Sequence, residues 1–291
     1  MENYVLENNH LMATFKAEGA ELTSVRRKDS NQEYIWQADP AIWARHAPVL
    51  FPIVGRLMDD QYTLRGETYS MGQHGFARDQ NFSVVNHSAT EITLGLTASP
   101  ETQKIYPFNF VLDIRYTLNY NELMVTYMVT NRDQVGLPFS IGAHPAFYCP
   151  AQQGQQWEEY HLKFEKNETL DRHLLENGLR NGKTERLLTN EDVLPLHRKL
   201  FESDAIIFKD TESDWVQIIR QSDGQPIVTV SFSGFPYLGI WQKVGVDFYC
   251  IEPWYGIADT ADRSGDFAEK EGIRQLSPGE QFVAKYQIKF H

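Results

Sequence analysis

Apolar and polar residues alternate along most of the chain. Two long alternating runs, residues 110–118 and 123–130, are separated only by the polar segment 119–122. Strict alternation places the apolar side chains on one face of a strand, and a short polar break between two such runs predicts a hairpin. Further strands are predicted at residues 10–15, 20–25, 32–36, 160–164, 205–208, 216–220, 227–232, 237–241, 248–252 and 281–290. The chain is therefore expected to be rich in β-structure.

Turn and helix signals interrupt these strands at a few places. Residues 65–67, Arg-Gly-Glu, predict a hairpin turn, and residues 99–106 are the one helical interruption of the strand pattern. Asp39 followed by Pro40 has the form of a helix cap with proline at the first helical position, which predicts one short helical turn. Residues 169–198 have the least regular pattern and are expected to be irregular, with turns at Asn177-Gly178 and Asn181-Gly182.

The composition limits which domain organisations and which classes of partner are possible. No repeat, low-complexity tract or linker divides the sequence, so residues 1–291 are predicted to form one β-rich domain. The chain has 39 acidic and 27 basic residues, a net charge of −12, which argues against nucleic acid and anionic membrane as partners. The aromatic share of 13% fits either a β-rich core or a surface on which sugars stack.

Targeting signals and cysteine usage indicate a cytoplasmic protein. The N-terminus shows neither a cationic region nor an apolar run, and no apolar stretch approaches the ~20 residues of a spanning helix. Cys149 and Cys250 are too few for a disulfide framework and match no zinc spacing. Both are expected to be free thiols, with no disulfide and no metal.

Four polar residues stand within apolar or glycine-rich runs: Arg56, His74, His144 and Glu252. A charge at the end of a buried strand must be paired, solvated or functional, because burying it alone is costly. Taken singly, each has a structural reading: an ion pair for Arg56, a turn residue for His74, a buried histidine for His144 and an edge-strand carboxylate for Glu252. Position alone does not decide between these readings and a functional one.

The residues around His144 favour a functional reading for it. Pro145 biases the preceding residue toward an extended backbone, so the imidazole is held on a stiff segment. Histidine also has the side-chain pKa nearest to neutral pH, which suits an acid or a base.

Taken together and in order, the segments FPIVGRL, HGFARD, GAHPAFY and IEPWYGIADT resemble the aldose 1-epimerase (mutarotase) family. They are most similar to its LacX-like bacterial branch, and the resemblance covers nearly the whole chain. It implies an all-β fold, a large antiparallel β-sandwich of the galactose mutarotase type. It also implies an isomerase that interconverts the α and β anomers of a free aldohexose, with a sugar as its small-molecule partner and without metal or cofactor.

The resemblance also implies a role for individual residues. His144 and Glu252 correspond to the catalytic histidine and glutamate of the family, and Arg56 and His74 to its sugar-binding arginine and second histidine. An aspartate that binds the sugar is expected between His144 and Glu252, and Asp204 is the residue chosen for it.

The proposed reaction explains why these residue types are needed. Opening a cyclic hemiacetal requires a proton at the ring oxygen while another proton leaves the anomeric hydroxyl. With ordinary pKa values of ~6.5 for histidine and ~4.3 for glutamate, an imidazolium acid and a carboxylate base would be near their working protonation at neutral pH. Trp241 and Phe147 are candidates to stack on a sugar face, with core packing as the alternative for each.

The sequence leaves two alternatives open. A mutarotase for hexose 6-phosphates would need a basic cluster, for which Arg78 and Arg45 are the candidates. A sugar-binding protein without catalysis would need no matched acid and base. Ala143 and Ala146 replace the asparagine and the aromatic residue of the galactose mutarotases, so galactose is not implied as the substrate. The oligomeric state is left open.

Overall fold

The predicted β-structure is confirmed in the computed structural model, which describes residues 3–151, 154–262 and 265–291. The strands are β1 (Asn3–Glu7), β2 (Leu11–Lys16), β3 (Leu22–Arg27), β4 (Val49–Leu50), β5 (Gln61–Leu64), β6 (Glu67–Ser70), β7 (Ser83–His87), β8 (Glu91–Thr97), β9 (Phe110–Asn119), β10 (Glu122–Asn131), β11 (Leu137–Phe139), β12 (Ile141–Ala143), β13 (Ala146–Tyr148), β14 (Tyr160–Glu168), β15 (Asp171–Glu176), β16 (Leu179–Arg186), β17 (Glu191–Pro195), β18 (Ile206–Lys209), β19 (Trp215–Arg220), β20 (Pro226–Ser231), β21 (Tyr237–Trp241), β22 (Phe248–Tyr255), β23 (Arg274–Leu276) and β24 (Gln281–Phe290). The helical elements are α1 (Pro100–Gln103) and the 3-10 helices η1 (Met58–Asp60), η2 (Ala77–Asp79), η3 (Trp157–Glu159), η4 (Arg198–Phe201) and η5 (Phe267–Glu269).

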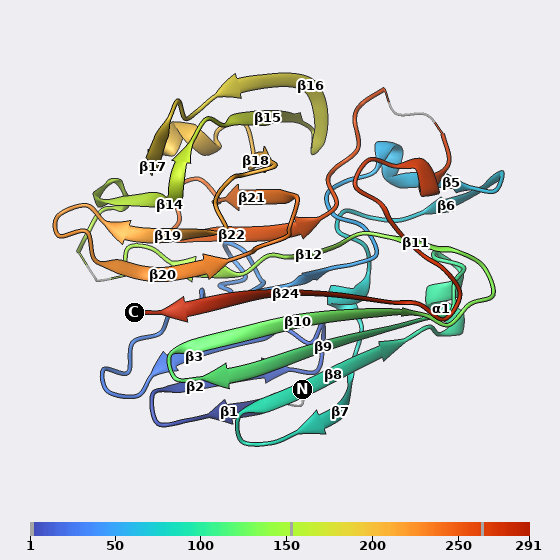
Figure 1. The fold of residues 1–291 in the computed structure, drawn as a ribbon, viewed down its shortest axis with the longest axis horizontal. Coiled ribbons are helices and arrows are strands. Elements are labelled where there is room, and N and C mark those ends of the chain that lie inside the picture. The colour runs from blue at the N-terminus through green and yellow to red at the C-terminus, as the bar shows by residue number, and fades with distance from the viewer. Residues whose placement is uncertain (1–2, 152–153, 263–264) are drawn as a thin grey trace.

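Two large sheets form the antiparallel β-sandwich. The nine-stranded sheet has the order β17-β14-β19-β20-β24-β10-β9-β8-β7. The second sheet runs β16-β15-β18-β21-β22-β12-β4, and β13 also pairs with β22. Figure 1 shows β16, β15, β18, β21 and β22 of this second sheet in that order, one beneath another. A three-stranded sheet, β1-β2-β3, and two two-stranded sheets complete the fold.

Strand β22 has two chemically different faces. Tyr249 and Ile251 belong to the main apolar core, together with residues of both large sheets such as Val125 of β10 and Ile240 of β21. Alternation places the side chains of Cys250, Glu252 and Trp254 on the opposite face. Seven of the eight residues of β22 are buried, so this opposite face is covered as well. A glutamate on such a strand is held away from bulk water.

The hairpins follow the predicted pattern closely. Strands β9 and β10 pair from Asn119 and Glu122 onward, with Tyr120 in the left-handed conformation at φ 49° that a two-residue loop requires. The hairpin turn at residues 65–67 joins β5 to β6, and the helical interruption within 99–106 is α1. The segment after Asp39 forms one hydrogen-bonded turn, in which the amide of Trp43 donates to the carbonyl of Asp39 over 2.8 Å.

The prediction that residues 169–198 are irregular is wrong. They form the hairpin of β15 and β16, followed by β17. Asn177 and Gly178, both at positive φ, make the turn between β15 and β16. Five consecutive residues at the end of β16 are exposed. A strand with little burial carries no apolar alternation, so the pattern could not reveal it.

Cys149 and Cys250 are both buried, and both are free thiols. Within the described ranges, no helix has the length and apolar character that crossing a membrane requires.

Candidate active site

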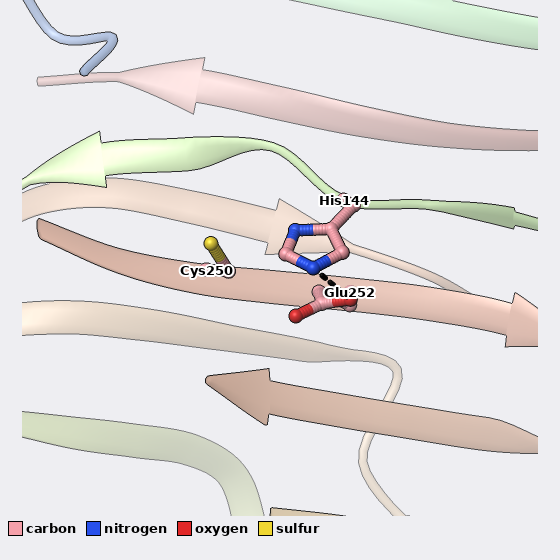
Figure 2. Close-up of side chains that lie close together, drawn as sticks. All are labelled: His144, Cys250 and Glu252. Carbon is pink, nitrogen blue, oxygen red and sulfur yellow. Dashed lines mark ion pairs between the residues drawn. The ribbon is translucent and has the colours of Figure 1, made fainter. Parts of the chain in front are cut away.

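An interrupted strand pairing sets His144 opposite Glu252. Gly142 of β12 pairs with Trp254 of β22, and Ala146 of β13 pairs with Cys250. His144 lies midway between the two paired positions, where the partner residue in the register is Glu252. The imidazole Nε2 of His144 is 3.3 Å from a carboxylate oxygen of Glu252 (Figure 2).

Two glycines on the strands that neighbour β22, Gly142 opposite Trp254 and Gly239 opposite Glu252, make room for the indole of Trp254. A Cβ added at Gly142 would lie 2.5 Å from the Trp254 ring, and one added at Gly239 would lie 2.4 Å from it. The indole therefore lies against both neighbouring strands, and its N–H donates to the carbonyl of Ala143. This packing explains the glycine at position 142, because a side chain there would collide with the indole.

The other two sequence segments join the site through Gly55. The amide of Gly55 donates to Nδ1 of His74 over 3.1 Å, and the amide of His74 donates back to the carbonyl of Gly55. Gly55 has a φ of 75°, and a Cβ there would lie 2.5 Å from the Cβ of Ala258. The segments that contain Arg56, His74, His144 and Glu252 thus meet in space.

A cavity of about 400 Å³ opens at this meeting point. The side chains on its walls include Trp43, His74, Arg78, His144, Asp204, Trp241, Lys243, Glu252 and Trp254. Four of the five residues expected at the site are among these: His74, His144, Asp204 and Glu252.

Arg56 is the expected residue that the structure does not bring to the cavity wall. Its guanidinium forms two hydrogen bonds of 2.8 Å with the carboxylate of Asp60 and donates to the carbonyl of Asn177. Its side chain lies next to Gly178, which does line the cavity. The sugar-binding role of Arg56 stays a prediction.

Aromatic rings surround the imidazole of His144. The indole of Trp43 stacks on it with the ring centroids 5.2 Å apart and an angle of 29° between the planes. Trp43 stacks in turn on Phe248 at 5.4 Å, so its indole lies between the two rings. Trp241 and His74 approach the imidazole edge-on at 5.5 and 5.7 Å.

Burial opposes the charged form of both members of the pair. It lowers the pKa of His144 to about 3 and raises the pKa of Glu252 well above its ordinary value, with the nearby charge of Asp204 as a second cause for Glu252. Without a bound sugar, the pair is therefore expected to hold one proton, with a neutral imidazole and a protonated carboxyl. This state has the same number of protons as the imidazolium and carboxylate expected from ordinary pKa values.

His74 is fixed in a single tautomer. Its Nδ1 accepts the hydrogen bond from Gly55, so in the neutral ring the proton is on Nε2. Burial, followed by the charge of His144, lowers its pKa well below the ordinary value, which favours the neutral ring. Its φ of 67° is one of two positive values among the expected site residues; Asp204, at 73°, is the other. Such strain in residues other than glycine is concentrated at functional sites.

The cavity residues that were not assigned to the site from the sequence include Trp43, Arg78 and Lys243. Trp43 and Lys243 gave no signal, since one follows a helical turn and the other stands in a loop. Arg78 was considered only as a candidate phosphate ligand, although it lies in the same segment as His74. Its Nη2 donates to the carbonyl of Gln73, whereas its buried Nε has no hydrogen-bond partner among the described residues.

The structure distinguishes the two candidates for stacking on a sugar, Trp241 and Phe147. Trp241 lines the cavity, as a stacking role requires. Phe147 has no exposed surface and belongs to the main apolar core, so core packing, one of the two roles left open for it, is the one that the structure shows. On β13, Phe147 points away from the face that carries Ala146, because neighbouring strand residues alternate.

Comparison with known proteins identifies the family. The family model described as Aldose 1-epimerase matches residues 2–289. The plasmid-encoded protein LacX of Lactococcus lactis is 32% identical over 293 residues, 97% of each chain. A galactose mutarotase related enzyme from Lactobacillus acidophilus has 37% identity and a TM-score of 0.95, with 100% of this chain and 97% of that chain covered. A galactose mutarotase-like protein from Lactobacillus casei has 34% identity and a TM-score of 0.93, with 100% of both chains covered. On this evidence, the chain belongs to the aldose 1-epimerase family.

Proposed function

We propose that the protein is a mutarotase that interconverts the α and β anomers of a free aldohexose. The observation that carries this proposal is the His144–Glu252 pair, 3.3 Å apart on the wall of a cavity. Both carboxylate oxygens of Glu252 are buried and make no well-aligned hydrogen bond among the described residues, because the indole N–H of Trp254 donates to the carbonyl of Ala143 and His144 Nε2 is 3.3 Å away. Buried acceptors are normally satisfied, so a ligand that brings hydroxyl groups fits this site.

The pair supplies the acid and the base that ring opening needs. When a sugar donates its anomeric hydroxyl to Glu252, the carboxylate form is stabilised and the shared proton can reside on His144. His144 then protonates the ring oxygen as Glu252 takes the proton of the anomeric hydroxyl, and the ring opens to the free aldehyde. Rotation about the bond to the anomeric carbon and reversal of both proton transfers close the ring as the other anomer.

The cavity walls hold the ring against this pair. The fixed tautomer of His74 makes its Nε2–H a donor, Arg78 offers a charged donor, and Asp204 offers an acceptor. Positioning of this kind reduces the entropy that the reaction must otherwise lose.

Replacing Trp43 by alanine is expected to lower kcat. The indole keeps the imidazole of His144 in place by stacking between it and Phe248. Misplacing a catalytic group by about 1 Å can cost up to ~10²-fold, and we expect about 10-fold here. Trp43→Phe is the matched control, because it retains an aromatic face and should keep most of the rate. Equal rates for Trp43→Ala and the unchanged protein would show that Trp43 does not position His144.

Arg78 and Arg56 can be separated by their effects on KM. A hydrogen bond from a charged donor contributes about 1.5–3 kcal/mol, so Arg78→Gln should raise KM at least about 10-fold. Arg56→Gln should change KM less, since the Arg56 guanidinium is bound to Asp60. Steady-state rates over a range of sugar concentrations measure both. If Arg56→Gln raises KM more than Arg78→Gln does, Arg56 binds the sugar, as the family resemblance implies.

Polarimetry of freshly dissolved α-glucose and α-galactose tests the proposal. The protein should speed the approach to the equilibrium rotation, and the rate should be proportional to its concentration. Glu252→Gln, purified in parallel, controls for contaminating mutarotase. A protein that binds these sugars without changing the rate would be the non-catalytic alternative.

A hexose 6-phosphate is the second candidate substrate. Arg78 and Lys243 both line the cavity, and two cations there fit a phosphate. Arg45, the other residue suggested for phosphate binding, is not on the cavity wall and instead pairs with Asp79 at 2.8 Å. A value of kcat/KM for α-glucose 6-phosphate well above that for α-glucose would favour this candidate.

A further inference from the structure

Cys250 lies close to His144 and Glu252, and its thiol is a third side chain of a kind that binds metal ions. It lies two residues before Glu252 on β22, so alternation places both side chains on the face that carries the cavity. One ligand atom from each of His144, Cys250 and Glu252 can be chosen so that all lie within 4.8 Å of one another (Figure 2). All three residues are buried, and the proposed reaction gives Cys250 no role.

The dimensions of the cluster are close to those of a zinc site. Two nitrogen or oxygen ligands at about 2.0–2.1 Å from a tetrahedral zinc ion are about 3.4 Å apart. His144 Nε2 and the nearest Glu252 oxygen are 3.3 Å apart without any ion. The sulfur needs to be about 3.5 Å from the other two ligand atoms, since the zinc–sulfur bond is about 2.3 Å. The three ligand atoms that lie within 4.8 Å of one another, one from each residue, would have to approach by at most about 1.3 Å per separation to reach this geometry.

Buried polar atoms of the cluster that make no hydrogen bond favour the binding of a cation. Nδ1 of His144 and both oxygens of Glu252 are buried and have no hydrogen-bond partner among the described residues. Buried polar atoms of this kind need an explanation, and a bound ion is one of the usual ones.

We propose that His144, Cys250 and Glu252 together bind a cation with affinity for sulfur, such as Zn²⁺, and that the bound ion blocks the site. Binding displaces two protons to solvent, the thiol proton of Cys250 and the single proton that the His144–Glu252 pair holds, because thiolate, carboxylate and neutral imidazole are the forms that ligate metal. The fourth coordination position faces the cavity, where a water molecule or a sugar hydroxyl completes the tetrahedron. The ion is an inhibitor here, since it occupies the two groups that ring opening uses.

Binding is tested first, without reference to catalysis. The full-length protein, freed of metal with a chelator, is titrated with Co²⁺, which reports tetrahedral sulfur ligation through a thiolate-to-cobalt absorption band in the near ultraviolet. We expect one equivalent of Co²⁺ to produce the band and Zn²⁺ to abolish it by displacement. Mg²⁺ should have no effect on the band, because it prefers an octahedral set of oxygen ligands.

Cys149→Ser is the matched control for Cys250→Ser, because both cysteines are buried and free. The band should survive in Cys149→Ser and disappear in Cys250→Ser. Loss of second-shell partners alone typically weakens metal binding 10–100-fold, so we expect Cys250→Ser to weaken Zn²⁺ binding at least about 100-fold by calorimetry. His144→Ala is a second variant that should also lose the band.

Inhibition is tested second and rests on the proposed function. Zn²⁺ should abolish mutarotation by the unchanged protein and by Cys149→Ser, and a chelator should restore it. In Cys250→Ser, the Zn²⁺ concentration that halves the variant's own rate should rise by at least about 100-fold, in line with the loss of a ligand. A cobalt band without any mutarotase activity would leave the metal site standing and refute the proposed function. A cobalt spectrum that is the same in Cys250→Ser as in the unchanged protein would refute the metal site.

Discussion

Glu252→Gln is expected to remove nearly all mutarotase activity. The amide keeps the shape of the side chain and can neither take the anomeric proton nor return it. A general acid or base typically contributes ~10²–10⁴-fold, so kcat should fall by that factor. Polarimetry measures the loss, and near-ultraviolet circular dichroism checks that the fold is retained. Glutamine at position 252 is expected to disturb the fold little, because burial favours a neutral side chain there.

The combination with His144→Ala tests whether the two groups act in one transition state. Groups that act as a unit lose activity non-additively, so the double variant should be little slower than the slower single variant. Glu101→Gln, in the exposed first turn of α1, is the control and should have the normal rate. Near-normal turnover by Glu252→Gln would contradict the assignment. Additive losses in the double variant would instead mean that the two residues act in separate steps.

The pairing of His144 with Glu252 was expected from two motifs, whereas its geometry depends on the register of β22. The motifs around His144 and Glu252 identify the two residues by resemblance, over a separation of more than one hundred positions. What brings them together is the pairing of Gly142 with Trp254 and of Ala146 with Cys250. Hydrophobic alternation locates β22 in the sequence but does not specify its neighbours, so the contact between the two residues needed the structure.

The fold was predictable wherever strands are buried on one face. β9 and β10 alternate buried and less buried residues almost without exception, and the alternating pattern located them correctly. β16 is mostly exposed and gave no such signal. The order of strands in the two sheets depends on contacts between distant residues, which no local pattern encodes.

The residues that surround the pair were the least predictable part of the site. Trp43 reaches His144 from a turn one hundred positions earlier in the chain, and its stacking depends on the tertiary fold. Arg56 shows the opposite case, because its position in a motif suggested a sugar ligand and a local pairing with Asp60 holds its side chain elsewhere. A motif identifies the segment that reaches a site more reliably than the side chain that points into it.

The second large effect is expected on stability, from the buried ion pair behind the cavity wall. Lys270 Nζ lies 3.5 Å from a carboxylate oxygen of Asp259, and both side chains are only 1% exposed. Asp259 also accepts from the amide of Met58, and its own amide donates to the carbonyl of Arg56. The pair therefore ties the loop that carries Ala258, a residue of the cavity wall, to the segment around Arg56.

Asp259→Asn is expected to lower the free energy of unfolding by about 3 kcal/mol, because breaking a buried pair leaves one charge uncompensated. The amide retains the volume and an acceptor for Met58, so the loss measures the charge. Urea denaturation gives the free energy, and Asp192→Asn is the matched control. Asp192 pairs with Lys163 at 3.4 Å on the surface, where both side chains are well exposed. An exposed pair contributes only ~0–1 kcal/mol.

A double variant distinguishes two costs of Asp259→Asn: the lost attraction between Lys270 and Asp259, and the burial of the Lys270 charge without a partner. Lys270→Met combined with Asp259→Asn removes the charge that the single variant leaves buried, and buried pairs can be replaced by neutral groups at little cost. The double variant should therefore recover more than half of the stability that Asp259→Asn loses. If Asp259→Asn unfolds at the same urea concentration as Asp192→Asn, the pair does not hold the cavity wall in place. A double variant less stable than Asp259→Asn would show that the ammonium of Lys270 is stabilised mainly by other contacts, since it also donates to the carbonyl of Ile257.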